Sequence, residues 1–220
     1  ASPVAVETCS GGGVIGHRAF HRYPAIVAPL AGALAEGLRA AGMKSVGKHF
    51  PGHGFVEADS HVAIPVDERD FDTIWRTDIQ PYLQLGQQID AVMPAHVIYP
   101  AVDSMPAGFS RKWVQDILRE RLAFNGVVFS DDLSMEGASV AGDVVARAQA
   151  AWHAGCDMVL VCNARATAVE LIDRWHPEHD SVRSARVASL LPASPFPDRS
   201  QLAQDTRYRD ALGLVQRMNA

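Results

Sequence analysis

Cysteine, runs of basic residues and long apolar stretches are all scarce in this chain of 220 residues. Its three cysteines, Cys9, Cys156 and Cys162, fit neither the spacing of a zinc module nor a small disulfide scaffold. The net charge is −5 and no Lys/Arg run occurs, which argues against nucleic acid or an anionic membrane surface as a partner. No window holds the roughly 18 apolar residues that a membrane-spanning helix needs, and the opening residues lack the pattern of a secretory signal. We therefore expect a cytoplasmic protein that binds neither nucleic acid nor membrane.

The apolar residues that are present suffice for one sizeable core. Of all residues 48% are hydrophobic and 20% are charged, which is typical of a globular domain. Short apolar runs alternate with longer amphipathic segments, the pattern expected of βα units around a parallel sheet. We predict strands at residues 3–8, 43–50, 90–97, 126–131 and 157–162. We predict helices at residues 25–40, 73–88, 111–122, 140–154 and 164–175.

About five βα units predict an α/β fold of one of two kinds. A closed (β/α)8 TIM-type barrel needs eight strands and typically about 250 residues, so the chain would hold an incomplete barrel with its N-terminal strands missing. An open sheet of five strands is the alternative. We expect the partial barrel at residues 1–176, followed at 177–220 by a linker and a possible helix at 201–218. An incomplete barrel exposes strand edges, so we also expect the isolated chain to fold poorly.

Histidine, lysine and aspartate crowd into the segment after the second predicted strand. Residues 48–61 read KHFPGHGFVEADSH, and glycine-rich loops of this kind often carry catalytic side chains. Asp59 and His61 are close enough in sequence for the carboxylate to bond one imidazole nitrogen, which would make His61 a tuned acid/base. A merely solvated histidine is the simpler interpretation, but the neighbouring Lys48 and His49 favour the functional one.

Metal binding is an alternative use of the same loop. His49, His53 and Asp59 or His61 offer nitrogen and oxygen ligands suited to zinc or iron. Proline and glycine break the loop, however, so it cannot present two histidines on one helix face as an HExxH motif does. We therefore expect no metal at this site.

Two adjacent carboxylates, Asp131 and Asp132, end the apolar strand predicted at 126–131. Because like charges repel, we expect the two to have separate uses, one of which could be to cap the next helix. Successive strand residues point to opposite faces, so we expect Asp131 to face a ligand and Asp132 to bond the scaffold. A carboxylate that faces the ligand can stabilise an oxocarbenium-like transition state or attack a sugar carbon. Asp131 is therefore the candidate nucleophile.

Four segments together resemble the bacterial β-N-acetylhexosaminidases of glycoside hydrolase family 3. They read GKHFPGHGFVEADSHVAIPVDER, DAVMPAHVIYPAVD, GVVFSDDLSMEGA and DMVLVCN, and the similarity runs in order from about Val14 to Asn163. The resemblance implies a retaining exo-acting hydrolase on a (β/α)8 barrel that releases terminal β-linked N-acetylglucosamine. Members of the family begin further upstream, which implies about two more βα units before Ala1.

The resemblance also implies a role for six residues: Asp131 as nucleophile, His61 with Asp59 as acid/base, and Arg18, Lys48 and His49 as ligands of the terminal sugar. It implies no cofactor and a small carbohydrate partner. The implied substrates are cytoplasmic muropeptides that carry N-acetylglucosamine on anhydro-N-acetylmuramic acid. We expect a monomer. The alternative hypothesis is an inactive, truncated sugar-binding remnant of the same family.

Overall fold

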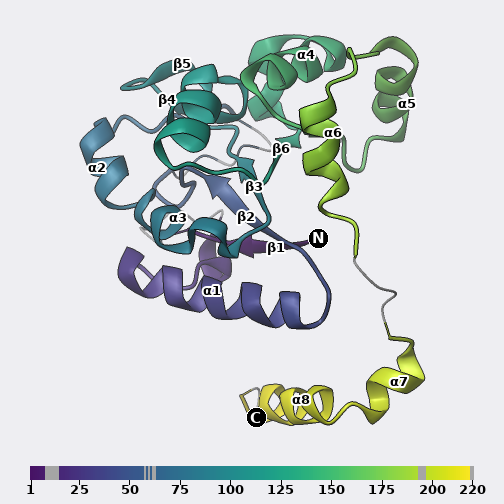
Figure 1. Ribbon diagram of the computed structural model, residues 1–220. Coiled ribbons are helices and arrows are strands. Elements are labelled where there is room, and N and C mark those ends of the chain that lie inside the picture. The colour runs from purple at the N-terminus through teal and green to yellow at the C-terminus, as the bar shows by residue number, and fades with distance from the viewer. Residues whose placement is uncertain (8–14, 57, 59, 61–62, 193–196, 219–220) are drawn as a thin grey trace.

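A five-stranded parallel sheet forms the centre of the protein (Figure 1). The computed structural model describes residues 1–7, 15–56, 58, 60, 63–192 and 197–218. Each strand of the sheet overlaps one of the predicted strands: β1 (Ser2–Ala5), β2 (Ser45–Phe50), β3 (Ala91–Pro94), β6 (Val127–Asp132) and β7 (Met158–Leu160).

The strands lie in the sheet in the order of the chain, β1-β2-β3-β6-β7, and each neighbouring pair is parallel. A doubly wound open sheet reverses its strand order at a switch point, whereas a barrel adds each strand beside the previous one. The order therefore favours the barrel-type arrangement over the open-sheet alternative. Within the described ranges, no further strand pairs with the outer edge of β1 or β7, so the barrel is partial there.

Large aromatic side chains anchor the end of β2, where the histidine-rich loop begins. The ring of Phe50 lies 5.2 Å from that of Tyr82 and 5.9 Å from that of Trp113, both edge to face. Trp113 belongs to a π-helix, Lys112–Arg121, which lies within the helix predicted at 111–122. Edge-to-face packing of buried rings is favourable beyond the area that it removes from water, so this group fixes where the loop leaves the sheet.

The chain between β3 and that π-helix forms a small antiparallel hairpin that was not predicted. Its strands are β4 (Ile98–Tyr99) and β5 (Asp103–Pro106), and a 3-10 turn, Ala107–Phe109, follows. On the other side of β2, α1 (Pro24–Ala40) is close to the helix predicted at 25–40. It packs against β1 and against α3 (Gln80–Leu85).

The helix predicted at 73–88 is interrupted, so the prediction of one continuous helix was wrong. α2 (Phe71–Arg76) ends before Thr77, and α3 begins with Pro81 in its first turn. Proline lacks an N–H group and disfavours the helical conformation in the residue before it. Between the helices, Asp78 is buried and its carboxylate binds Arg69. A tertiary ion pair and a proline thus override the helical periodicity.

The helix predicted at 140–154 begins four residues later than expected. Gly142 has a φ of 97°, and Asp143 accepts a hydrogen bond from the N–H of Ala146 at the start of α4 (Val144–Ala154). The residues before this cap form a separate 3-10 helix, Glu136–Ala141. The next helix, α5 (Arg165–Arg174), agrees with the prediction of 164–175.

One helix, α6 (Ser181–Ala188), lies in the segment that was expected to be a linker. Asp180 caps it by accepting from the N–H groups of Val182 and Arg183. The Arg183 guanidinium stacks 3.6 Å from the centroid of the Trp152 ring. Contacts of this kind between distant segments have no signature in the local sequence, which is why the helix was missed.

The final predicted helix, at 201–218, is two helices. α7 (Arg199–Gln204) and α8 (Thr206–Met218) are separated at Asp205, whose backbone is extended. No residue of either is buried, and Figure 1 shows both helices apart from the rest of the protein. Within the described residues, no helix is long and apolar enough to cross a membrane.

Candidate active site

The carboxyl ends of the strands meet at a pocket of about 240 Å³. Side chains from three strand ends line it: Lys48 and His49 from β2, Asp131 and Asp132 from β6, and Asn163 after β7. Side chains far apart in the sequence therefore share one pocket. His96, which follows β3, is not among the lining residues, but its Nε2 atom lies 3.1 Å from the carbonyl oxygen of Asp132.

Asp131 occupies the wall of the pocket as a buried carboxylate, 7% exposed. Burial alone would raise its pKa, but His49, His96, the N–H of Asp132 and Lys48 together hold the pKa of Asp131 below its usual value. Its Oδ1 atom accepts a hydrogen bond of 2.8 Å from the N–H of Asp132, and Oδ2 lies 3.9 Å from Nε2 of His49. The pocket thus presents an ionised carboxylate.

Asp132 bonds the scaffold, as expected from the alternation along the strand. Its Oδ1 atom accepts from the N–H of Ser134 at 2.9 Å, the hydroxyl of Ser134 at 2.7 Å and the N–H of Cys162 at 3.0 Å. It therefore joins the end of β6 to the segment after β7. The two adjacent aspartates have separate positions and separate partners.

His49 is held from behind by a residue that the sequence reasoning missed. Glu7, which follows β1, is buried, and its Oε1 atom lies 2.9 Å from Nδ1 of His49. The only sequence signal for Glu7 was an acidic residue at the end of an apolar strand. Nothing local indicated its partner, which is 42 residues away in the chain.

Lys48 and Arg18 also line the pocket. Lys48 is near the end of β2, and both the Lys48–His49 and the Phe50–Pro51 peptide bonds are cis. Arg18 is the last residue of a short 3-10 helix, Gly16–Arg18. The structure therefore brings Lys48, His49 and Asp131 together with Arg18, as the site hypothesis requires.

Asp59 and His61, the predicted acid/base pair, lie outside the described residues. Ser60, between them in the sequence, is buried and lines the pocket. Its hydroxyl lies 3.2 Å from Nε2 of His53, and its carbonyl accepts from the N–H of Gly137 at 2.8 Å. Burial, together with the nearby His49, lowers the pKa of His53.

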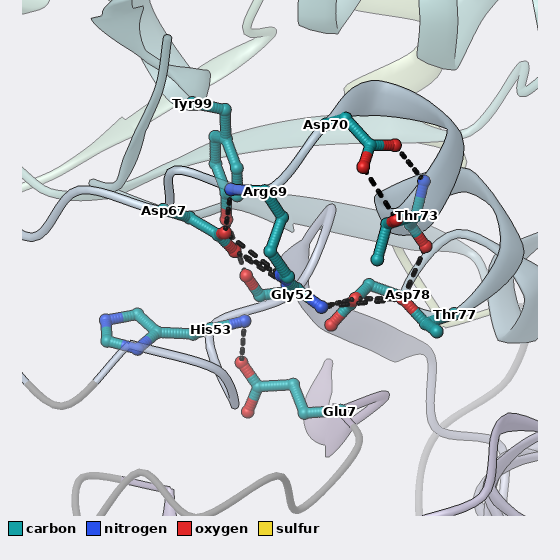
Figure 2. A network of polar contacts seen from close by, with 10 residues as sticks. All are labelled: Glu7, Gly52, His53, Asp67, Arg69, Asp70, Thr73, Thr77, Asp78 and Tyr99. Atoms are coloured by element: carbon teal, nitrogen blue, oxygen red, sulfur yellow. Dashed lines mark hydrogen bonds and ion pairs between the residues drawn. The ribbon is translucent and has the colours of Figure 1, made fainter. Parts of the chain in front are cut away.

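A network of charges lies next to Gly52, in the loop that starts at Pro51 (Figure 2). Arg69 binds Asp67 at 2.6 Å and Asp78 at 2.8 Å, and both carboxylates are buried. Burial alone would lower the pKa of Arg69, but the two carboxylates raise it above its usual value, so the guanidinium stays charged. The Tyr99 hydroxyl donates to the carbonyl of Gly52. The network therefore contacts the loop at Gly52, through Tyr99 and Asp78.

Metal ligands are not gathered in the described part of the chain, where no group of three His, Cys, Asp or Glu side chains could hold an ion. Two of the ligands that a metal site in the loop would use, Asp59 and His61, lie outside that part.

Comparison with known proteins identifies the family. The family described as "Glycosyl hydrolase family 3 N terminal domain" matches residues 1–188. A protein named beta-hexosaminidase from Aromatoleum aromaticum is 58% identical over 203 residues, which are 92% of this chain and 57% of that protein. One with the same name from Bordetella parapertussis is 58% identical over 202 residues, 91% of this chain and 57% of that protein. The chain thus spans 57% of the length of these two relatives.

Solved structures agree with this assignment. NagZ from Neisseria gonorrhoeae, in complex with N-trifluoroacetyl-D-glucosamine, has a TM-score of 0.86 and 44% identity, and the match covers 96% of this chain and 62% of that one. A family 3 beta-N-acetylglucosaminidase from a Paenibacillus strain has a TM-score of 0.79 and 27% identity, with 94% of this chain and 43% of that one covered. By sequence and by fold, the chain belongs to glycosyl hydrolase family 3, whose N-terminal domain it matches over residues 1–188.

Proposed function

We propose that the protein is a retaining exo-hydrolase that releases terminal β-linked N-acetylglucosamine, with Asp131 as its nucleophile. The observation that carries the proposal is the position of this carboxylate at the end of β6, where it faces the pocket and has a lowered pKa. An ionised carboxylate there can attack the anomeric carbon of a bound sugar. The beta-hexosaminidase names of the relatives support the same chemistry.

The reaction would pass through a glycosyl-enzyme in two steps. An oxygen of Asp131 bonds to the anomeric carbon while the bond to the leaving-group oxygen breaks, and that oxygen takes a proton from His61. Water then attacks the same carbon and gives a proton to His61, and Asp131 is released. Asp59 would orient the imidazole of His61.

The carboxylates of the pocket support a histidine as the acid/base, because neither of them is available for that role. Asp131 and Asp132 are the acidic residues among the described side chains that line it, and one oxygen of Asp132 already accepts three hydrogen bonds. A second free carboxylate beside the nucleophile would add like-charge repulsion, whereas imidazole becomes neutral when it gives up its proton. Ser60 in the pocket wall is next to His61 in the sequence, which supports placing the acid/base in this loop.

The sugar would be bound by Arg18, Lys48 and His49, which surround the same pocket as Asp131. Arginine and lysine donate hydrogen bonds to sugar hydroxyls and carbonyl groups. The solved Neisseria relative binds an N-acylated glucosamine derivative, which supports an N-acetylglucosamine unit here. We further propose a cytoplasmic muropeptide with anhydro-N-acetylmuramic acid as the full substrate; this assignment rests on the motif resemblance alone.

Replacement of Asp131 by Asn tests the nucleophile. We expect turnover of a chromogenic N-acetylglucosaminide to fall by at least about 1,000-fold, because the neutral amide cannot form the intermediate, while calorimetric binding of N-acetylglucosamine persists. The matched control is Asp173→Asn on the exposed surface of α5, which should keep full turnover. Unchanged turnover in Asp131→Asn would refute the assignment.

A second candidate function is an inactive sugar-binding protein of the same family, because a pocket lined by Arg18, Lys48 and His49 would also suit a sugar that is bound without turnover. The same experiment separates the two. Wild-type protein that binds N-acetylglucosamine but never turns over the chromogenic substrate would establish the binding function.

A further inference from the structure

Glu7 is a buried acidic residue behind the pocket, and three nitrogen atoms converge on one of its oxygens. It is 1% exposed. Its Oε1 atom lies 2.9 Å from Nδ1 of His49 and accepts hydrogen bonds of 3.2 Å from the backbone N–H groups of His49 and His53. Figure 2 shows the bond between Glu7 and the backbone of His53. Among the described residues, Oε2 has no partner.

This arrangement determines which nitrogen of His49 carries the proton. A carboxylate oxygen can only accept, so Nδ1 must be the protonated nitrogen that faces Glu7. In the neutral ring, Nε2 is then bare. Nε2 is on the pocket side, 3.9 Å from Oδ2 of Asp131.

We propose that Glu7 is a positioning residue that fixes His49 in its Nδ1–H tautomer and so presents Nε2 to the sugar as a hydrogen-bond acceptor. The proposal rests on the function proposed above. With the opposite tautomer, the N–H at Nε2 would face the nucleophile's own carboxylate, whose Oδ2 atom lies 3.9 Å away, and would be drawn toward it. Glu7 therefore keeps two neighbouring groups of the pocket from pairing with each other.

The two backbone bonds to Glu7 make its replacement by glutamine informative. They hold an accepting oxygen at the Oε1 position, so a glutamine side chain would place its carbonyl oxygen there and its NH2 group at the Oε2 position. The amide oxygen would still accept from Nδ1 of His49. Glu7→Gln thus removes the charge and keeps the acceptor, whereas Glu7→Leu removes both.

The direct test is the ¹⁵N NMR spectrum of the histidine side chains at pH 8, with His49→Gln used only to assign the signals. We expect a protonated Nδ1 and a bare Nε2 for His49 in the wild type and in Glu7→Gln. We expect the proton to move to Nε2 in Glu7→Leu. A protonated Nε2 in the wild type at this pH, or an unchanged tautomer in Glu7→Leu, would overturn the proposal.

Kinetics with the chromogenic N-acetylglucosaminide give a second measurement. Glu7→Leu should lower kcat/KM by about 100-fold, because Nε2 of His49 would then carry a proton and could no longer accept a hydrogen bond from the sugar. Glu7→Gln should stay within about 3-fold of the wild type, because the acceptor remains. The exposed Glu120→Leu in the π-helix is the matched control and should change nothing. If Glu7→Leu does not fold, the wild type and Glu7→Gln still decide, since loss of the Nδ1–H tautomer in Glu7→Gln would overturn the proposal.

The tautomer is read without turnover, so failure here is distinct from failure of the proposed function. A wrong tautomer together with an inactive Asp131→Asn would refute only the role of Glu7. The expected tautomer together with an active Asp131→Asn would refute only the nucleophile.

Discussion

Asp131 and His96 lie in one buried environment. Both have lowered pKa values, but for different physical reasons. For Asp131, its interactions with His49, His96, the N–H of Asp132 and Lys48 outweigh desolvation and favour the charged carboxylate. For His96, desolvation is the largest effect and lowers the pKa despite the attraction of Asp131 and Asp132. The Nε2 atom of His96 lies 3.1 Å from the carbonyl oxygen of Asp132, and Nδ1 has no partner among the described residues. A second proton on this ring would therefore have no acceptor.

The lowered pKa of His96 predicts how the free energy of unfolding depends on pH. Its folded pKa is below the unfolded value of 6.5, so the unfolded chain takes up a proton that the folded protein refuses. The contribution of His96 to the free energy of unfolding is thus fully present above about pH 6.5. It decreases as the pH falls below that value, by up to about 1.4 kcal/mol for each pH unit. We expect the loss in the free energy of unfolding between pH 7.5 and 5.5, measured in urea, to be smaller in His96→Gln than in the wild type. An equal loss in both proteins would contradict this, and the exposed His153→Gln is the control.

At the scale of elements, two sets of contacts hold the first residues of the loop after β2. In the first set, Glu7 accepts hydrogen bonds from the backbone N–H groups of His49 and His53. In the second set, the Tyr99 hydroxyl donates to the carbonyl of Gly52, and Gly52 packs closely against Asp78, whose side chain is itself bound to Arg69. Losing one partner of such a buried ion pair typically costs about 3–5 kcal/mol, because it leaves the other charge uncompensated. These contacts position the loop that carries the predicted acid/base.

Gly52→Ala tests this support. A Cβ atom at Gly52 would lie 2.3 Å from Oδ1 of Asp78, which Arg69 holds in place. We expect the free energy of unfolding to fall by about 1–3 kcal/mol and kcat/KM to fall with it, because either the loop or the ion pair must move. The control is Gly37→Ala in α1, where an added Cβ would meet no atom of the described residues within 4 Å apart from its own chain neighbours and helix backbone. Alanine also favours the helix, so stability should rise by about 0.5–1 kcal/mol. Equal changes in stability in the two variants would contradict a supporting role for the contact between Gly52 and Asp78.

At the scale of the whole molecule, the parallel sheet and the placement of candidate site residues at the ends of two strands were predictable from the sequence. Apolar runs ended by polar residues indicated β6 and β7, and the alternation along β6 predicted the different positions of Asp131 and Asp132. Glu7 and the break at Asp78 were not predictable, because each depends on a partner in another segment: His49 in one case and Arg69 in the other. Helix α6 was missed for the same reason.

The extent of the barrel is the other whole-molecule feature. The described strands leave the outer edges of β1 and β7 unpaired, and the chain spans 57% of the length of the two relatives compared. Poor folding of the isolated chain stays a prediction. The site residues that the structure describes nevertheless come together within this sheet, since Arg18, Lys48, His49 and Asp131 line one pocket.

The central claim, that Asp131 becomes covalently glycosylated, is tested most directly by mass spectrometry of a trapped intermediate. A fluorinated N-acetylglucosamine donor with a good leaving group slows both steps but lets the first proceed, so the glycosyl-enzyme accumulates. We predict one added sugar residue on the peptide that contains Asp131 and none in Asp131→Asn. A sugar attached to another residue, or wild-type turnover that persists in Asp131→Asn with no trapped adduct, would contradict the account.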